Sequence, residues 1–328
     1  MSERFESLQD WLKETLDTSD FILKPASEDA SFRYYYRLTL DNKTFIVMDA
    51  PPDQEDCKPF IRVSKLLHAG NVNVPIIHNM DLEQGFLLLS DFGDDHYLNK
   101  LSNLTANNLY SDAIQTILSM QLGSDVKELG KYDEALLRRE MSLFTDWLLD
   151  KQLGIRLDTD QTNAIDALFD LLVTNALEQP QVFVHRDFHS RNLMLTEENN
   201  PGVIDFQDAV VGPITYDLVS LLKDCYIKWT AKEINGWATF YLNELGMHDS
   251  KLDIDREQFQ RWFDLMGVQR HLKASGIFAR LSHRDDKHGF LKDIPRTLSY
   301  IVDLKSTYKE LLPLCQLIET SILPELEK

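Results

Sequence analysis

The chain has few cysteines, fewer basic than acidic residues, and no long apolar run. Its three cysteines, Cys57, Cys225 and Cys315, are odd in number, far apart and without a CxxC pair, which argues against a disulfide framework. Its 34 Lys and Arg face 53 Asp and Glu, a net charge of −19 that repels nucleic acids and anionic membranes. No stretch approaches the roughly 20 apolar residues of a membrane span, and the amino-terminal segment lacks the apolar core of a signal peptide. These absences predict a cytoplasmic protein without nucleic-acid or membrane partners.

The 328 residues are enough for two lobes around a substantial core. The first part of the chain shows the short apolar or alternating runs of strands, at residues 32–40, 44–48, 76–77 and 85–89. Helical spacing predicts helices at 5–16, 60–67, 109–122, 136–148 and 165–176, and from about residues 216, 232, 256 and 295. We therefore expect lobes of residues 1–92 and 93–328. No repeat or flexible linker separates them.

The segment from Val182 to Leu222 carries the most chemical information. An apolar strand leads into His185-Arg186-Asp187, and Asn192 follows five residues after Asp187. Two short apolar runs then flank the turn-rich sequence EENNPG, a pattern that predicts a hairpin. This hairpin brings Asn192 beside Asp205, with Asp187 on the loop that leads into it. The arrangement suits a base for a substrate hydroxyl and two oxygen ligands for Mg²⁺ on a nucleoside triphosphate.

The tripeptide His-Arg-Asp occurs twice, and only the first copy has this context. The second copy, 283–285, has no asparagine five residues on and no following strand pattern, so we expect a loop or a helix end there. A metal-dependent hydrolase is an alternative interpretation of the first copy, because His185, Asp187 and His189 alternate along one strand-like face. Transition-metal sites usually take more His or carboxylate ligands from elsewhere, and no second histidine cluster has matching spacing. Phosphoryl transfer is therefore favoured.

The loop HRDFHSRN resembles the HGDxHxxN loop of aminoglycoside phosphotransferases, choline kinases and related small-molecule kinases. Its second histidine, His189, distinguishes this group from most protein kinases. Ile204-Asp205-Phe206 is similar to the metal-binding segment of the group, and Gly212 to Leu218 resembles the segment that begins the next helix. The resemblance implies an α+β, protein-kinase-like fold. Its small lobe would hold a five-stranded antiparallel sheet, and its larger lobe would be mostly helical.

The resemblance also implies roles for individual residues. Asp187 would be the base or hydroxyl-orienting group, with His189 as a second catalytic candidate. Asn192 and Asp205 would bind Mg²⁺, and Asp217 would brace the backbone of the catalytic loop. The implied co-substrate is ATP.

The nucleotide side departs from the pattern of the wider family at two places. The third-strand position that normally supplies a lysine to the phosphates is Met48, with Arg33 and Arg37 as candidate replacements for the charge. The segment 28–31 is not a glycine-rich loop, although backbone N–H groups of residues 30–32 could still cover phosphates. Adenine is expected to pair with backbone groups between Leu88 and Asp91. The candidate nucleotide-binding residues are Ala30, Ser31, Phe32, Arg33, Met48, Leu88, Leu89, Ser90 and Asp91.

Other segments resemble one branch of the group, the anomeric kinases of N-acetylmuramate and N-acetylglucosamine that serve bacterial cell-wall recycling. These segments are residues 30–33, 45–52, 269–273 and 276–281. The resemblance to this branch implies ATP-dependent phosphorylation of the C1 hydroxyl of the sugar.

The stretch 266–297 is locally basic, with seven Lys or Arg against three Asp. An aminoglycoside is a polycation and should meet carboxylates, so a basic stretch favours a neutral or anionic sugar. Arg270 and Lys273 lie three residues apart on one helix face and could meet the lactyl carboxylate of N-acetylmuramate, which an arginine would bind bidentately. A solvated basic helix is the alternative. The candidate substrate-binding residues are Arg191, Gln269, Arg270 and Lys273.

Three classes of function stay open at the level of sequence. The favoured class is a small-molecule kinase, for the amino sugars or for an aminoglycoside, choline or homoserine type of substrate. A metal-dependent hydrolase would turn over without ATP. A catalytically dead pseudokinase is suggested by Met48, but the intact Asp187, Asn192 and Asp205 argue against it. A monomer is expected.

Overall fold

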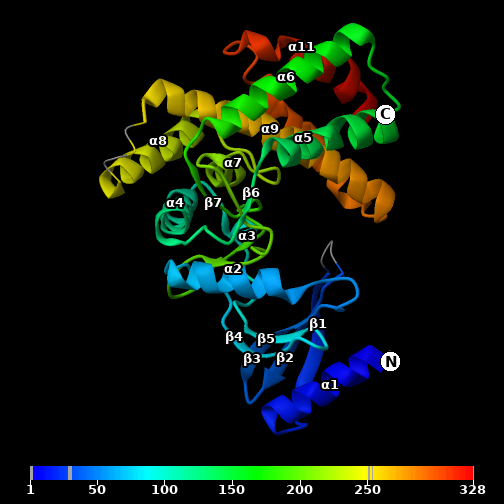
Figure 1. The fold of residues 1–328 in the computed structure, drawn as a ribbon, viewed down its shortest axis with the longest axis vertical. Helices are drawn as coiled ribbons and strands as arrows, with labels where there is room; N and C mark the ends of the chain where they lie inside the picture. Colours follow the sequence, from blue (N-terminus) through cyan, green and yellow to red (C-terminus); the bar gives the residue numbers. More distant parts are fainter. Residues whose placement is uncertain (1–2, 29–31, 250–251, 253, 328) are drawn as a thin grey trace.

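The computed structural model describes residues 3–28, 32–249, 252 and 254–327. It shows a smaller lobe built on a sheet and a larger, mostly helical lobe (Figure 1). The expected α+β, two-lobed architecture is confirmed. The last strand of the sheet ends at Ser90, and the next helix, α3 (Tyr97–Lys100), begins at Tyr97. The division that we predict at residues 92 and 93 falls in this connection.

Five antiparallel strands form the small-lobe sheet, in the order β1-β2-β3-β5-β4. They are β1 (Ile22–Glu28), β2 (Tyr34–Leu40), β3 (Lys43–Asp49), β4 (Ile77–Asp81) and β5 (Phe86–Ser90). The apolar pattern predicts the last four but not β1. Pro25 interrupts the pattern of β1, and the pairing with β2 shifts register between Pro25 and Ser27. An edge strand tolerates a proline at such an irregularity.

The connection between β2 and β3 is a two-residue hairpin turn. Leu40 pairs with Lys43, and Asp41 and Asn42 between them have φ angles of 49° and 63°. A positive φ at both central residues is what a type I′ turn requires, and its twist matches that of the strands. Asp and Asn tolerate this conformation better than other residues with a Cβ atom.

The sheet is covered on both faces, because alternate residues of its central strands are apolar on each side. Val47 and Leu88 face α1 (Glu3–Leu16) and pack with its buried Leu8. Met48 and Leu87 face the other way and join the main core with α2 (Cys57–Ala69). Figure 1 shows these two helices on opposite sides of the sheet. Met48 has no exposed surface as a result.

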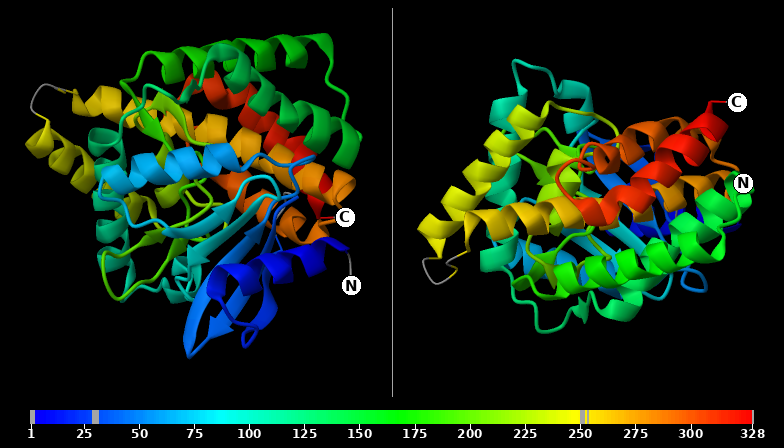
Figure 2. Two further views of the ribbon diagram at one scale, coloured as in Figure 1. Left: turned by 60° about the horizontal axis from the view of Figure 1, so that its bottom comes forward. Right: turned by 90° about the horizontal axis from the view of Figure 1, so that it is seen from above.

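The larger lobe is arranged around the long helix α9 (Arg256–Arg284), which contacts α5, α6, α7, α10 and η1 (Figure 2). The second His-Arg-Asp lies at the carboxyl end of α9, as expected. No helix in the described ranges combines the length and apolar character needed to cross a membrane. The other helical segments of this lobe are α4 (Ala106–Gly123), α5 (Glu134–Leu143), η1 (Phe144–Gln152), α6 (Thr159–Leu177), α7 (Tyr216–Leu222), α8 (Ala231–His248), η2 (His288–Asp293), α10 (Ile294–Val302), η3 (Lys309–Leu311), α11 (Leu312–Leu317), η4 (Ile318–Ile322) and α12 (Leu323–Leu326).

Gly276 lets α9 approach the backbone of a neighbouring helix. A Cβ atom at this position would lie 2.2 Å from the carbonyl carbon of Leu143 and 2.5 Å from the nitrogen of Phe144. These two residues mark the point where α5 ends and the π-helical η1 begins. Any side chain at Gly276 would therefore force the two helices apart.

His271, on the buried part of α9, is held in its neutral form. Its ring stacks on Tyr300 with centroids 4.9 Å apart, and its Nε2 lies 2.8 Å from the carbonyl oxygen of Lys223. A carbonyl oxygen only accepts, so Nε2 carries the hydrogen and donates it. Burial lowers the pKa of His271 to about 3.

The fold should lose stability in acid because of this neutral histidine. An unfolded histidine titrates near pH 6.5, so below that pH the unfolded chain binds a proton that the folded chain excludes. The contribution of His271 is fully present above pH 6.5 and is lost as the pH falls towards 3. Between about pH 6 and 4, the unfolding free energy of the wild type should fall relative to that of His271→Asn by up to about 1.4 kcal/mol per pH unit.

Urea unfolding at pH 7 and pH 5 measures this difference. The exposed His283 lies on the same helix, so His283→Asn is a matched control that should keep the wild-type pH dependence. Parallel pH curves for the wild type and His271→Asn would show that His271 is not held neutral.

Candidate active site

The loop that carries Asp187 is held by the start of α7. β7 (Gln181–Val184) pairs antiparallel with β10 (Val210–Pro213), which runs on towards α7. In the first turn of α7, Asp217 accepts hydrogen bonds from the backbone N–H groups of His185 at 2.7 Å and Arg186 at 3.1 Å. Arg186 has a φ angle of 77°, a conformation that costs free energy in a residue with a side chain. Asp217 thus makes the contacts expected of a brace.

Asp217 has no exposed surface. Burial raises the pKa of its carboxyl to about 7, and its two N–H donors oppose the rise. The carboxyl therefore acts through the loop backbone and has no surface for a substrate.

Asn192 and Asp205 meet at one end of a short hairpin. Its strands, β8 (Leu193–Met194) and β9 (Gly202–Val203), pair Leu193 with Val203. The Nδ2 atom of Asn192 donates to Asp205 Oδ2 at 3.1 Å and to the carbonyl oxygen of Asp187 at 3.0 Å. The juxtaposition required by the hairpin prediction is therefore present.

Asp205 is held in place from both sides. Its φ angle is 64°, and Gln207 Nε2 donates to its Oδ1 at 2.8 Å. The next residue, Phe206, is fully buried and packs on Phe60 of α2 with ring centroids 4.8 Å apart. A buried aromatic anchor thus sets the direction of the carboxylate beside it.

The donor set at this point fits Mg²⁺. Because the amide nitrogen of Asn192 is engaged, its Oδ1 is the atom left for a cation, and Asp205 adds a carboxylate. Mg²⁺ is typically bound through one or two carboxylates, with substrate phosphates and water completing the octahedron. Within the described ranges, no group of three or more His, Cys, Asp or Glu is placed to hold a metal ion.

The hairpin is also bonded to the small lobe and to the connection between the lobes. The N–H of Val203 donates to the carbonyl oxygen of Asn73 at 2.8 Å, and the N–H of Leu195 donates to that of Asp95 at 2.7 Å. Asn73 follows α2 and Asp95 follows β5. The candidate metal site therefore lies at the junction of the two lobes.

His185 has a structural role in the loop. Its Nδ1 accepts from the N–H of Asp187 at 3.3 Å, and its Nε2 lies 3.1 Å from the carbonyl oxygen of Ile204. Nε2 must donate to that carbonyl, so the ring is neutral and both nitrogens are occupied. Burial lowers its pKa to about 4. The metal-hydrolase alternative needs His185, Asp187 and His189 as ligands, but both ring nitrogens of His185 are already occupied by hydrogen bonds.

Asp187 is partly exposed and surrounded by cations. Burial alone would raise the pKa of its carboxyl, but the charges of Lys273, Arg270 and Arg186 outweigh burial and lower it to about 2. Asp187 is therefore ionised throughout the physiological range. Such a weak base can hold and orient a hydroxyl, and it takes the proton only when that hydroxyl has become strongly acidic.

The ring of His189 packs edge-on against the ring of Tyr226, with the two centroids 5.4 Å apart. Its backbone N–H donates to the carbonyl oxygen of Asp187 at 3.1 Å. Burial lowers the pKa of His189, and its buried Nδ1 has no hydrogen-bond partner among the described groups. A neutral imidazole with a vacant nitrogen thus lies two residues from Asp187.

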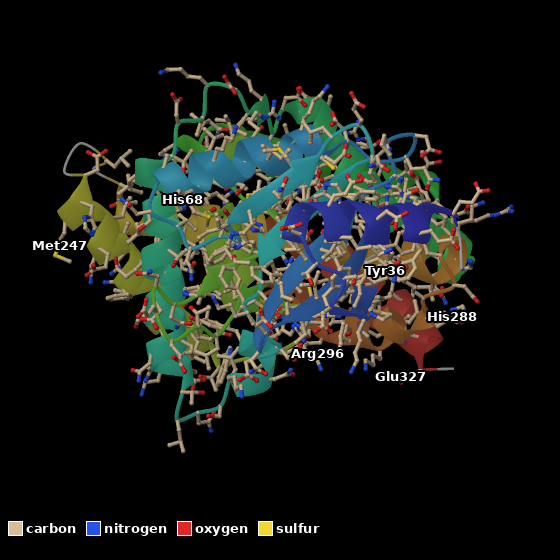
Figure 3. All side chains as sticks on the ribbon, turned by 90° about the horizontal axis from the view of Figure 1, so that it is seen from below. Tyr36, His68, Met247, His288, Arg296 and Glu327 are labelled. Carbon is tan, nitrogen blue, oxygen red and sulfur yellow. The ribbon has the colours of Figure 1, made fainter. Side chains whose placement is uncertain are left out.

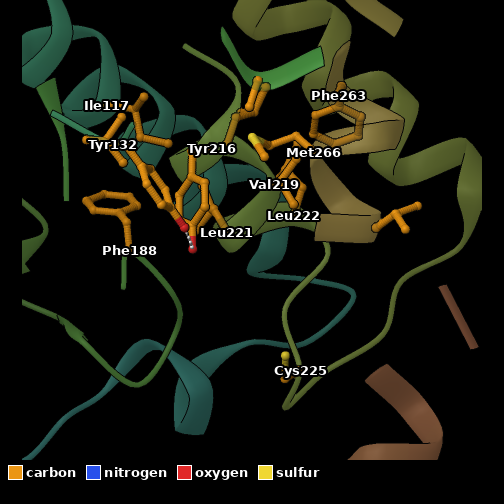
Figure 4. Packing of buried hydrophobic residues seen from close by; sticks show 14 of the residues in the cluster. Ile117, Tyr132, Phe188, Tyr216, Val219, Leu221, Leu222, Cys225, Phe263 and Met266 are labelled. Atoms are coloured by element: carbon orange, nitrogen blue, oxygen red, sulfur yellow. Dashed lines mark hydrogen bonds between the residues drawn. The ribbon is translucent and has the colours of Figure 1, made fainter. Parts of the chain in front are cut away.

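A buried ionic cluster that the sequence analysis missed supports the loop. Glu140 of α5 is paired with Arg186 of the loop and with Lys273 of α9, and it accepts a hydrogen bond from the hydroxyl of Tyr132. The Tyr132 and Tyr216 hydroxyls lie 3.5 Å apart in the same cluster (Figure 4). The sequence contains one sign of this cluster, because Glu140 lies on the otherwise apolar face of the helix predicted at residues 136–148. An unpaired carboxylate is costly to bury, so a glutamate on that face indicates a buried cationic partner.

The α9 residues expected to bind substrate are all buried. Gln269 Nε2 donates to the Tyr132 hydroxyl at 3.2 Å, and Lys273 Nζ donates to the Tyr216 hydroxyl at 3.1 Å. Lys273 is also neutralised by Glu140, 3.3 Å away. Arg270 Nη1 lies 3.4 Å from Cys225 Sγ, while its buried Nε has no partner among the described groups. From these buried positions, Lys273 and Arg270 lower the pKa of Asp187.

Most of the candidate nucleotide-binding residues lie in the small lobe, before β2 and along β5. Ala30 and Ser31 lie outside the described residues, and Phe32 is exposed. Leu88 and Leu89 lie in the middle of β5, which pairs with β3 on one side and β4 on the other. Their backbone groups are therefore taken up by the sheet, and the Ser90 N–H donates to Ile76. The adenine contact expected between Leu88 and Asp91 stays a prediction, and of these residues Asp91 lies beyond the end of β5.

The two candidate replacements for the missing lysine differ in their surroundings. Arg37 donates to Asp91 at 2.7 Å, to Asp94 at 2.6 Å and to the Gly93 carbonyl at 3.1 Å, so it fastens β2 to the segment after β5. Arg33 pairs with Glu55, just before α2, at 2.9 Å. Both arginines are therefore engaged in ion pairs within the protein.

Sequence comparison places the chain among known enzymes. The model of the phosphotransferase enzyme family matches residues 22–252. The N-acetylmuramate/N-acetylglucosamine kinase of Pseudomonas aeruginosa is 44% identical, over 96% of both chains. A protein of the same name from Neisseria meningitidis is 40% identical, over 96% of this chain and 95% of its own.

Structural comparison gives the same fold at much lower identity. The choline kinase LicA from Streptococcus pneumoniae superimposes with a TM-score of 0.65 at 12% identity, over 91% of this chain and 99% of its own. An aminoglycoside phosphotransferase in complex with gentamicin gives a TM-score of 0.62 at 14% identity, over 95% and 98%. The family model and the near full-length relatives lead to one conclusion: the chain is a member of the phosphotransferase enzyme family, and it is a kinase.

Proposed function

We propose that this enzyme transfers the γ-phosphoryl group of ATP to the C1 hydroxyl of N-acetylmuramate and N-acetylglucosamine. The observation that carries the proposal is the 44% identity, over 96% of both chains, to the Pseudomonas aeruginosa kinase named for these two sugars. The resemblances to choline and aminoglycoside kinases rest on 12% to 15% identity and concern the fold alone.

Asp187 is the residue that we assign to the attacking hydroxyl. The carboxylate accepts the hydrogen bond of the C1 hydroxyl and so directs its oxygen towards the γ-phosphorus. As the new O–P bond forms, the bond to the bridging oxygen of ADP breaks, and the hydroxyl proton passes to Asp187. An anomeric hydroxyl is more acidic than an ordinary sugar alcohol, which suits a carboxylate whose pKa is lowered to about 2.

We assign the metal ligands to Asn192 Oδ1 and the Asp205 carboxylate. Mg²⁺ bound there would neutralise charge on the phosphates of ATP. The hydrogen bonds to Asp217 keep the catalytic loop in its strained conformation. They thereby fix the position of Asp187 relative to the two metal ligands.

The decisive assay is ADP release with N-acetylmuramate, N-acetylglucosamine, choline, homoserine and kanamycin as acceptors. The proposal expects turnover with the two amino sugars and at most background rates with the other three. Preferred turnover of kanamycin or choline would assign the enzyme to another branch. Substrate hydrolysis without ATP would support the hydrolase alternative, and nucleotide binding without turnover would support a pseudokinase.

ATP and a small amino sugar are the partners that this function requires. We expect a cytoplasmic location, where ATP is available, and this agrees with the three free thiols. A monomer stays our expectation.

A further inference from the structure

A pocket of about 670 Å³ opens beside the catalytic loop, within the size range of small-molecule sites. Arg191, four residues after Asp187, lines it, and so does Tyr226, whose ring contacts His189. The catalytic loop thus supplies both Asp187 and one wall of the pocket. The other side of the pocket is formed by the segment that includes Phe290, Lys292, Asp293 and Arg296.

Arg191 is a cation that two aromatic rings contact. Its guanidinium lies 4.8 Å from the ring centroid of Tyr226 and 5.4 Å from that of Phe290. Its own carbonyl accepts a hydrogen bond from His96 Nδ1 at 2.7 Å. No described carboxylate lies within ion-pair distance of the guanidinium. The two aromatic rings therefore hold the guanidinium of Arg191 at the pocket, and its N–H groups can bind a ligand.

The other two cations of the pocket differ from each other. Arg296 donates to Asp293 at 2.7 Å and to the Cys225 carbonyl at 2.9 Å, so its charge is largely used within the protein. Figure 3 shows Arg296 on the side of the molecule seen from the small-lobe end. Lys292 is exposed and makes no ion pair with a described residue. The pocket thus offers two unneutralised cations, Arg191 and Lys292, in a chain of net charge −19.

We propose that Arg191, assisted by Lys292, binds the lactyl carboxylate of N-acetylmuramate and so favours this sugar over N-acetylglucosamine. The inference rests on the proposed function. The lactyl group is carried on C3, separated from C1 by one ring carbon, so a sugar whose C1 hydroxyl meets Asp187 extends its carboxylate towards a neighbouring wall. Arg191 supplies a planar fork that matches a carboxylate.

This assignment replaces the sequence-based choice of Arg270 and Lys273. Helical spacing placed those two on one face but did not indicate that the face is buried. Lys273 is already paired with Glu140, and Arg270 is enclosed beside Cys225. Arg191 and Lys292, by contrast, are exposed and line a pocket.

Arg191→Met and Lys292→Met should alter the ratio of kcat/KM values for the two sugars. We expect Arg191→Met to raise KM for N-acetylmuramate about tenfold, as for the loss of one charged hydrogen-bonded contact, and to change KM for N-acetylglucosamine far less. Lys292→Met should shift the ratio in the same direction by a smaller factor. Arg284 belongs to the same basic stretch but pairs with Asp285 and lies outside the pocket, so Arg284→Met is the matched control and should keep the wild-type ratio.

A sugar analogue separates a lost charge contact from a general defect. For the wild type, converting the lactyl carboxylate of N-acetylmuramate to an amide should raise KM about as much as Arg191→Met does. In Arg191→Met the acid and the amide should have similar KM values. Equal changes for both sugars in Arg191→Met and Lys292→Met, or undiminished discrimination between acid and amide, would overturn the inference. Failure of the proposed function is a distinct result, in which the wild type phosphorylates neither sugar.

Discussion

Replacing Asp187 with Asn should lower kcat by about 100- to 10,000-fold, the usual contribution of a positioned acid or base. The amide keeps the shape of the side chain but neither carries the charge that orients the hydroxyl nor takes its proton. ATP binding and the fold should change little, because Asp187 is hydrogen-bonded to His185 and Asn192 through its backbone. Steady-state kinetics with N-acetylglucosamine and nucleotide titration of the variant measure the two effects separately.

The second His-Arg-Asp provides a matched control for this variant. Asp285 follows the same two residues, but it caps the end of α9 and pairs with Arg284. Asp285→Asn should keep wild-type kcat. Because the pKa of Asp187 is lowered to about 2, the carboxylate is ionised at pH 6 and at pH 8, and the loss in Asp187→Asn should be similar at both. Retention of more than about a tenth of wild-type kcat would mean that another group holds the hydroxyl.

Replacing Asp205 with Ala should weaken MgATP binding by roughly ten- to a hundredfold, the scale of one charged contact. Asn192→Ala should have a smaller effect, because an amide oxygen is a ligand for Mg²⁺ but neutralises none of its charge. The neighbouring Asp208 is exposed, and Asp208→Ala is the control for loss of a carboxylate in the same segment. Titration with MgATP measures all three variants.

The role of Asp205 is separated from general damage by repeating the titration without Mg²⁺. A metal ligand matters only when the metal is present, so the affinities of the wild type and Asp205→Ala for metal-free ATP should converge. Unchanged MgATP affinity and activity in Asp205→Ala would remove the basis for the whole assignment of the site.

The parts of the site that follow from local sequence were predictable. Asn192 and Asp205 flank one hairpin, so their meeting requires only that the turn-rich segment between them closes. The type I′ turn at Asp41 and Asn42 is local in the same way. β1 was not predictable from apolar alternation, because Pro25 breaks the pattern and the strand depends on its pairing with β2.

The parts that depend on packing between distant elements were not predictable. Glu140 meets Arg186 and Lys273 from two other elements, and no spacing in the sequence relates these three residues. The surroundings of α9 could not be predicted for the same reason. Periodicity shows which residues share a helix face, but α9 is enclosed by several helices, so Arg270 and Lys273 lie in the interior.

The central claim is that this kinase phosphorylates the C1 hydroxyl of an N-acetyl amino sugar, and phosphorus NMR of the reaction product tests it most directly. The purified enzyme is incubated with MgATP and, separately, with N-acetylmuramate and N-acetylglucosamine. The account predicts an anomeric C1 phosphate from each sugar, formed together with an equal amount of ADP. A C6 phosphate, or unconsumed ATP with both sugars, would contradict it.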